Sequence, residues 1–95
     1  MSVAARVSLT LLSRAYCHLC DEMAAALAPL AARFGVPVIV VDVDAHPALE
    51  ARYGERVPVV LLGDEHAGAE LCHHRLDPAA VTCALAAQQS SPSGG

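Results

Sequence analysis

The two cysteines of Cys17-His18-Leu19-Cys20 constrain this chain more than any other feature of its sequence. The motif follows an apolar run at 7–12 and precedes a segment with helical periodicity, so we predict that it lies between a strand and a helix. Residues three apart share one side of a helix, and the two sulfurs can therefore approach and close a small disulfide ring. The unpaired N–H groups and the macrodipole at a helix N-terminus favour a thiolate at Cys17. A thiolate is the form that attacks disulfides, so the position suits redox chemistry.

Length and charge limit the function classes that the chain can serve. Its 95 residues suffice for one domain with a modest core, which we place at 1–88. The segment 89–95 is rich in Ser and Gly, so we predict a disordered tail. The net charge of −4 and the lack of a basic patch argue against a nucleic-acid partner. No apolar run approaches the roughly 20 residues of a membrane span, so we expect no membrane partner.

We expect a cytoplasmic protein, which affects how the motif is interpreted. Thiols in the cytoplasm stay mostly reduced. A C-x-x-C motif there is more often redox-catalytic or metal-binding than a structural disulfide. We therefore interpret Cys17 and Cys20 as chemically active.

Apolar runs, turn residues and helical periodicity define seven elements. We predict strands at 7–12, 36–41, 57–62 and 70–73, and helices at 17–33, 48–53 and 79–88. The strands at 7–12 and 36–41 both have the composition of buried strands, and joining them by a helix makes them parallel. The short turn at 63–68 makes the last two strands an antiparallel hairpin. The predicted fold class is α/β, with a four-stranded mixed sheet in the order β-α-β-α-β-β-α and helices on both faces.

This order of elements resembles the thioredoxin superfamily, and more closely its small bacterial glutaredoxin-like branch. The likeness rests on the C-x-x-C motif at the start of the first long helix and on Val57-Pro58 at the start of the third strand. The segments that carry it are 11–22, 41–44 and 52–60, and the likeness extends over about 7–87. A Val-Pro about forty residues after the C-x-x-C makes the combination much more specific than the cysteine pair alone.

The resemblance implies roles for particular residues. Cys17 matches the exposed nucleophile and Cys20 the resolving cysteine. Pro58 matches a proline that the family holds in a cis peptide, which is a rare and purposeful geometry. The backbone of Val57 is then expected to face the bound thiol substrate. Apart from the resemblance, the position of Tyr16 beside the motif leaves three roles open for its ring: shielding the dithiol, contacting a substrate, or packing within its own loop.

Two departures from the family pattern concern the binding of glutathione and the pKa of the dithiol. Glutaredoxins usually place a Gly-Gly pair after the fourth strand to hold glutathione, whereas the stretch 72–77 has none. The residues between the cysteines are His18 and Leu19, in place of the Pro-Tyr or Gly-Pro of better-known relatives. A protonated His18 would lower the pKa of the Cys17 thiol, and the nearby acidic side chains at 21–22 would oppose it. The alternative is that His18 points to solvent.

From these features we predict a thiol-disulfide oxidoreductase that acts in electron transport and cell redox homeostasis. Its partner would be a disulfide-containing protein or a glutathione mixed disulfide. We expect a monomer with no tightly bound cofactor, re-reduced by glutathione or a reductase. Two other functions stay open: a non-catalytic adaptor with the same fold, and a metal or iron–sulfur handling protein.

Metal-ligand spacing gives the metal hypothesis little support. Cys72, His73 and His74 could join the dithiol, but no second C-x-x-C or H-x₃₋₅-H pair appears. We therefore assign no metal ligands. We expect Cys72 and Cys83 to be small buried hydrophobes.

Overall fold

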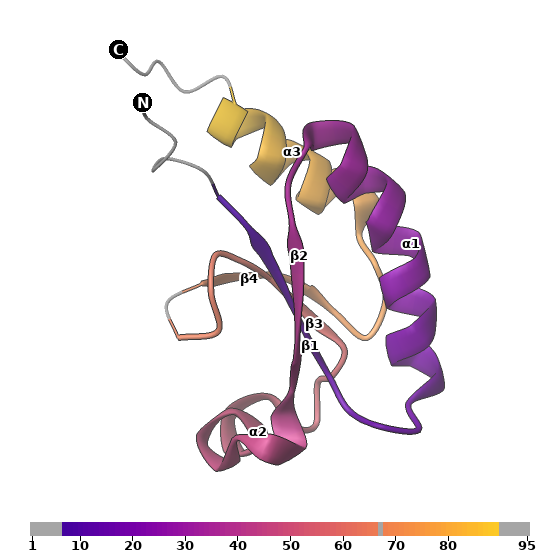
Figure 1. Cartoon of the computed structure of the whole chain (residues 1–95), viewed down its shortest axis with the longest axis vertical. Helices are drawn as coiled ribbons and strands as arrows, with labels where there is room; N and C mark the ends of the chain where they lie inside the picture. The colour runs from indigo at the N-terminus through magenta and orange to yellow at the C-terminus, as the bar shows by residue number, and fades with distance from the viewer. Residues whose placement is uncertain (1–6, 67, 90–95) are drawn as a thin grey trace.

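The computed structural model describes residues 7–66 and 68–89, and within them it has the predicted order of elements (Figure 1). The elements are β1 (Leu9–Ser13), α1 (His18–Phe34), β2 (Val38–Asp42), the 3₁₀ turn η2 (Val43–Ala45), α2 (Pro47–Tyr53), β3 (Val59–Leu62), β4 (Ala69–His73) and α3 (Pro78–Gln89). The turn η2 is the one element among them that we did not predict. Across these residues, no helix combines the length and the hydropathy needed to cross a membrane.

The four strands form one mixed sheet in the order β2-β1-β3-β4. The central strand β1 runs parallel to β2 and antiparallel to β3, with Leu12 opposite both Val41 and Val59. The strands β3 and β4 form the antiparallel hairpin, with an irregularity between Val60 and Leu61. This register places the end of β1 and the start of β3 at the same end of the sheet.

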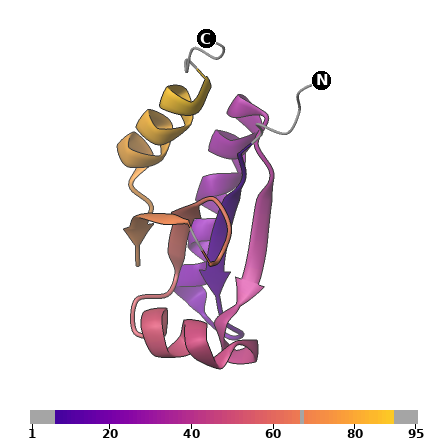
Figure 2. The same cartoon turned by 90° about the vertical axis from the view of Figure 1, so that its left-hand side faces the viewer.

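Side chains of β1 alternate between two separate hydrophobic cores. Leu9 and Leu11 join the core beneath α1 and α3, whereas Leu12 joins the core beneath α2. The helices α1 and α3 pack against each other, and α2 lies at the far end of the molecule (Figures 1 and 2). The predicted sheet with helices on both faces is therefore confirmed.

The helix α1 is fixed to the sheet by one buried stripe and closed by a glycine. Met23, Leu27 and Ala31 are buried at helical spacing and pack in the first core. Gly35 has a φ of 67°, which glycine adopts without a steric penalty, and its N–H bonds to the carbonyls of Ala31 and Ala32. The helix predicted at 17–33 is thereby confirmed, shifted by one residue.

Three expectations were wrong. The strand β2 is not buried: 49% of Ile39 and 61% of Val40 are exposed, because β2 lies at an edge of the sheet. Of the two cysteines expected to be buried, Cys83 is exposed on α3 and Cys72 is only half-buried in β4. Gln89 belongs to α3 and not to the tail, since the helix continues one residue beyond the predicted end. The rest of the predicted tail, 90–95, lies outside the described residues.

Candidate active site

The dithiol lies where the loop after β1 enters α1. Cys17 is the N-cap residue of this helix, with extended backbone angles, and the helix itself begins at His18. Its Sγ accepts a hydrogen bond from the N–H of Cys20 at 3.1 Å, and its carbonyl accepts one from Asp21. A sulfur is therefore in the place where a capping oxygen usually satisfies the first N–H groups of a helix.

Cys17 and Cys20 form a disulfide, and the two sulfurs differ in exposure. The Cα atoms are 5.1 Å apart, within the usual range for a bridged pair. Cys17 is half-buried, whereas only 2% of Cys20 is exposed. An incoming group can therefore reach the first sulfur more easily than the second.

His18 lies on the outer surface of the first turn of α1. Its side chain is largely exposed, and its Nε2 lies 2.7 Å from the Glu22 carboxylate, one turn along the helix. This arrangement joins the imidazole to an acidic partner at the helix surface. An effect of His18 on the Cys17 thiol stays a prediction.

Two apolar side chains stand out beside the dithiol. Tyr16 is fully exposed and has a φ of 57°, in the left-handed region that favours glycine. Leu19, between the two cysteines, is also exposed. Both side chains are therefore open to solvent on either side of Cys17.

The segment before β3 reaches the same end of the sheet. The peptide bond between Val57 and Pro58 is cis, the geometry that the resemblance implies. Because Val59 pairs with Leu12, Pro58 lies at the end of the sheet where β1 leads into the dithiol loop. Pro58 is buried and Val57 half-buried. The topology thus brings together the two segments that carry the predicted site residues.

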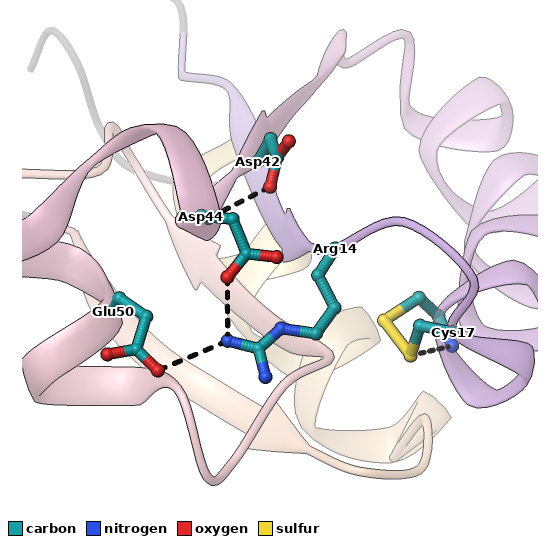
Figure 3. Close-up of polar contacts among 6 residues, drawn as sticks. Arg14, Cys17, Asp42, Asp44 and Glu50 are labelled. Carbon is teal, nitrogen blue, oxygen red and sulfur yellow. Dashed lines mark hydrogen bonds and ion pairs between the residues drawn. A yellow bond between two sulfur atoms is a disulfide. The ribbon is translucent and has the colours of Figure 1, made fainter.

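Arg14 is a residue of this region that sequence reasoning missed. Its guanidinium bonds to Asp44 at 3.1 Å and to Glu50 at 3.3 Å, which joins the dithiol loop to η2 and α2 (Figure 3). Its Nε is buried and has no hydrogen-bond partner among the described residues. Asp42 instead caps η2 by accepting the N–H of Asp44. The sequence did contain a signal for these ion pairs: a single arginine lies three residues before Cys17, and acidic residues follow the second strand.

A shallow groove runs along α1 beside the dithiol. It has a volume of about 280 Å³ and lies between α1 and the loop after β4. The residues that line it are Leu19, Glu22, Met23, Ala26, His74, Arg75 and Leu76. The groove therefore connects the residue between the two cysteines with the loop at 74–76.

The remaining cysteines lie apart from the dithiol. Cys72 is half-buried in β4, and burial raises the pKa of its thiol, although a backbone hydrogen bond from Asp77 acts in the opposite direction. Cys83 is exposed. Among residues 7–66 and 68–89, no three His, Cys, Asp or Glu side chains are placed to hold a metal ion together.

Comparison with known proteins identifies similar chains and folds. Residues 8–86 match the family model described as glutaredoxin-like domain (DUF836). An uncharacterized protein of Mycobacterium tuberculosis is 42% identical, over 75% of this chain and 79% of that protein.

Solved structures show the same likeness. A solution structure of a Nitrosomonas europaea protein has a TM-score of 0.73 at 33% identity and covers 83% of this chain and 91% of that one. An X-ray structure of an X. campestris protein has a TM-score of 0.62 at 41% identity, covering 84% and 97%. Oxidized mitochondrial thioredoxin 3 from Saccharomyces cerevisiae shares the fold, with a TM-score of 0.63 at 17% identity and coverage of 84% and 76%.

Proposed function

The chain belongs to the glutaredoxin-like domain family (DUF836), and from this membership and its dithiol geometry we propose that it is a thiol-disulfide oxidoreductase. Its fold and its bridged cysteines support a redox capability. We propose further that Cys17 attacks the substrate and Cys20 resolves the product.

The observation that carries this proposal is the difference between the two sulfurs. Cys17 is accessible at the helix N-terminus, and Cys20 is buried one turn further along. A thiolate at Cys17 would keep the hydrogen bond from the Cys20 N–H and gain from the helix dipole. The buried Cys20 sulfur can attack the mixed disulfide from the protein side, which a second substrate molecule cannot easily reach.

The reaction transfers two electrons in two exchanges. The Cys17 thiolate attacks one sulfur of the substrate disulfide, so that a mixed disulfide forms and one substrate thiolate leaves and takes up a proton. Cys20 then loses its proton to water and attacks the Cys17 sulfur. The second substrate thiol leaves, and the Cys17–Cys20 disulfide remains. Two thiols of glutathione, or a dithiol reductase, restore the reduced pair by the reverse exchanges.

The substrate proposal follows from the surroundings of Cys17. We place a disulfide-containing protein or a glutathione mixed disulfide against Tyr16, the Val57 backbone and Pro58, at the end of the sheet that holds the dithiol. In this proposal the protein acts as a cytoplasmic monomer without a tightly bound cofactor.

The experiment compares Cys17→Ser, Cys20→Ser and the wild type in the reduction of insulin disulfides by dithiothreitol. We expect Cys17→Ser to abolish the catalysed rate. Reduced Cys20→Ser, freed of dithiothreitol and mixed with insulin, should accumulate a mixed disulfide that mass spectrometry detects. Cys83→Ser is the matched control, because this thiol is exposed on α3, away from the dithiol, and its loss should change nothing. Equal and undiminished activity in Cys17→Ser and Cys20→Ser would refute the proposal.

A further inference from the structure

The loop after β4 contains a residue in an unfavourable conformation. His74 has a φ of 65°, in the left-handed region that residues with a Cβ rarely adopt. Such a conformation persists in a non-glycine residue only where the surrounding contacts hold it. The contacts of His74 therefore show which part of the molecule holds it in this conformation.

Two hydrogen bonds join His74 to the segment before β3. Its backbone N–H donates to the Pro58 carbonyl at 2.8 Å, and its Nε2 lies 3.0 Å from the Glu55 carbonyl oxygen. A carbonyl only accepts, so Nε2 carries the proton in this contact. The two bonds hold the segment 55–58 on both sides of Val57.

Neighbouring side chains of β4 support the same segment. Glu70 pairs with Arg56 at 3.3 Å and with His73 at 2.8 Å. The His73 ring in turn contacts the His74 ring edge-on, with centroids 4.9 Å apart. Ion pairs at a surface stabilise little by themselves, and the bond from His74 Nε2 is also exposed, so we assign the main restraint to the two His74 hydrogen bonds acting together.

His74 also borders the dithiol region directly. It lines the groove beside α1 together with Leu19, the residue next to Cys20. It therefore lies between the helix that carries both cysteines and the segment that carries Val57. A movement of His74 would change the spacing between these two parts of the site.

We infer that His74 is a positioning residue for peptide disulfides, because it fixes the Val57 backbone where a peptide flanking the substrate disulfide would pair with it. This inference rests on the proposed function. His74 acts through Val57 and takes no part in sulfur exchange. Its loss should therefore weaken substrate binding and leave the exchange steps unchanged.

Two substitutions separate the side-chain contact from the backbone conformation. His74→Gly adopts a positive φ without strain but removes the bond to Glu55. His74→Gln keeps a Cβ at this φ, as His74 itself does, and its longer side chain can bring an amide N–H to the position of Nε2. His66→Asn is the control, since His66 is an exposed histidine in the β3–β4 turn, at the opposite end of β3 from Pro58.

Kinetics with two substrates provide the first test. For insulin, we expect His74→Gly to raise KM about five-fold, the usual effect of one hydrogen bond, with kcat unchanged. Bis(2-hydroxyethyl) disulfide has no peptide group to pair with Val57, so its KM should not change. His74→Gln should recover most of the insulin KM. Equal KM increases for both substrates, or none for insulin, would overturn the inference.

Amide hydrogen exchange of Arg56 and Val57 tests the restraint without any turnover. Exchange should be faster in His74→Gly than in the wild type, and unchanged in His66→Asn. Unchanged exchange in His74→Gly overturns the inference even if the protein is active. A wild type that reduces no disulfide overturns the proposed function instead, and the exchange data still decide whether His74 holds the segment.

Discussion

Reducing the Cys17–Cys20 disulfide in the folded protein should lower its free energy of unfolding by about 1.9 kcal/mol. The bond joins residues three apart, so it closes a loop of only four residues. For such a loop the chain-entropy relation gives about 6 cal/mol/K, which is about 1.9 kcal/mol at 25 °C. The value is small because the unfolded chain gains little freedom when so short a loop opens.

The same stabilisation of about 1.9 kcal/mol predicts that the reduction potential of the disulfide differs between the folded protein and the unfolded chain. About 1.4 kcal/mol corresponds to 30 mV for a two-electron couple, so 1.9 kcal/mol corresponds to about 40 mV. Because the disulfide favours the folded state, the folded protein should hold its disulfide more tightly than the unfolded chain does. This entropic contribution makes the potential about 40 mV more negative, while the gain of the Cys17 thiolate from the helix dipole acts in the opposite direction.

Two independent measurements check this prediction. Urea unfolding with and without excess dithiothreitol gives the stability difference, and titration in glutathione buffers with and without urea gives the potential difference. Cys20→Ser cannot form the disulfide, so dithiothreitol should leave its unfolding unchanged. A reduced form more stable than the oxidised form would refute the entropic reasoning and would indicate a protein that oxidises thiols.

Four further outcomes follow from three local features. Asp77→Ala should lower the free energy of unfolding by about 1 kcal/mol in urea titrations, because the Asp77 carboxylate caps α3 by accepting the Ala80 N–H, and Asp77→Asn should keep most of it. Burial raises the pKa of Cys72, so at pH 8 iodoacetamide should alkylate it more slowly than Cys83, as peptide mass spectrometry can follow; equal rates would contradict the burial argument. Because the pKa of Cys72 is raised in the folded protein, the free energy of unfolding should fall as the pH rises above the ordinary thiol pKa. Cys72→Ala should not show this fall. Tyr16→Gly should leave the melting temperature unchanged or higher, since glycine accepts the positive φ, yet raise KM for insulin; an unchanged KM would remove Tyr16 from the substrate surface.

The sequence predicted the sheet because its signals were local. Each of these signals acts within a few residues. They include the C-x-x-C motif at a strand end, Gly35 after a helical stripe, and Asp77 before a helix. Hydrophobic runs located all four strands. Together these signals define the order of elements, and the order limits the topology.

What the sequence did not predict depends on tertiary neighbours. An apolar run such as that of β2 has the same composition at a sheet edge as at its centre, so the exposure of Val40 could not be predicted. The ion pairs of Arg14 join residues 30 and 36 positions away. The positive φ of His74 depends on carbonyls that lie before β3. Each of these features needed the folded chain.

The exposed edge strand has a consequence for solubility. Four consecutive β-branched residues of β2, at 38–41, carry no charge, which is the composition of segments that recruit further strands and start aggregates. Pro37 precedes them and lacks the N–H that a docking strand would need, and Asp42 follows with a charge. These two residues act as gatekeepers. The highest concentration at which this protein stays free of aggregates would then depend on Pro37 and Asp42.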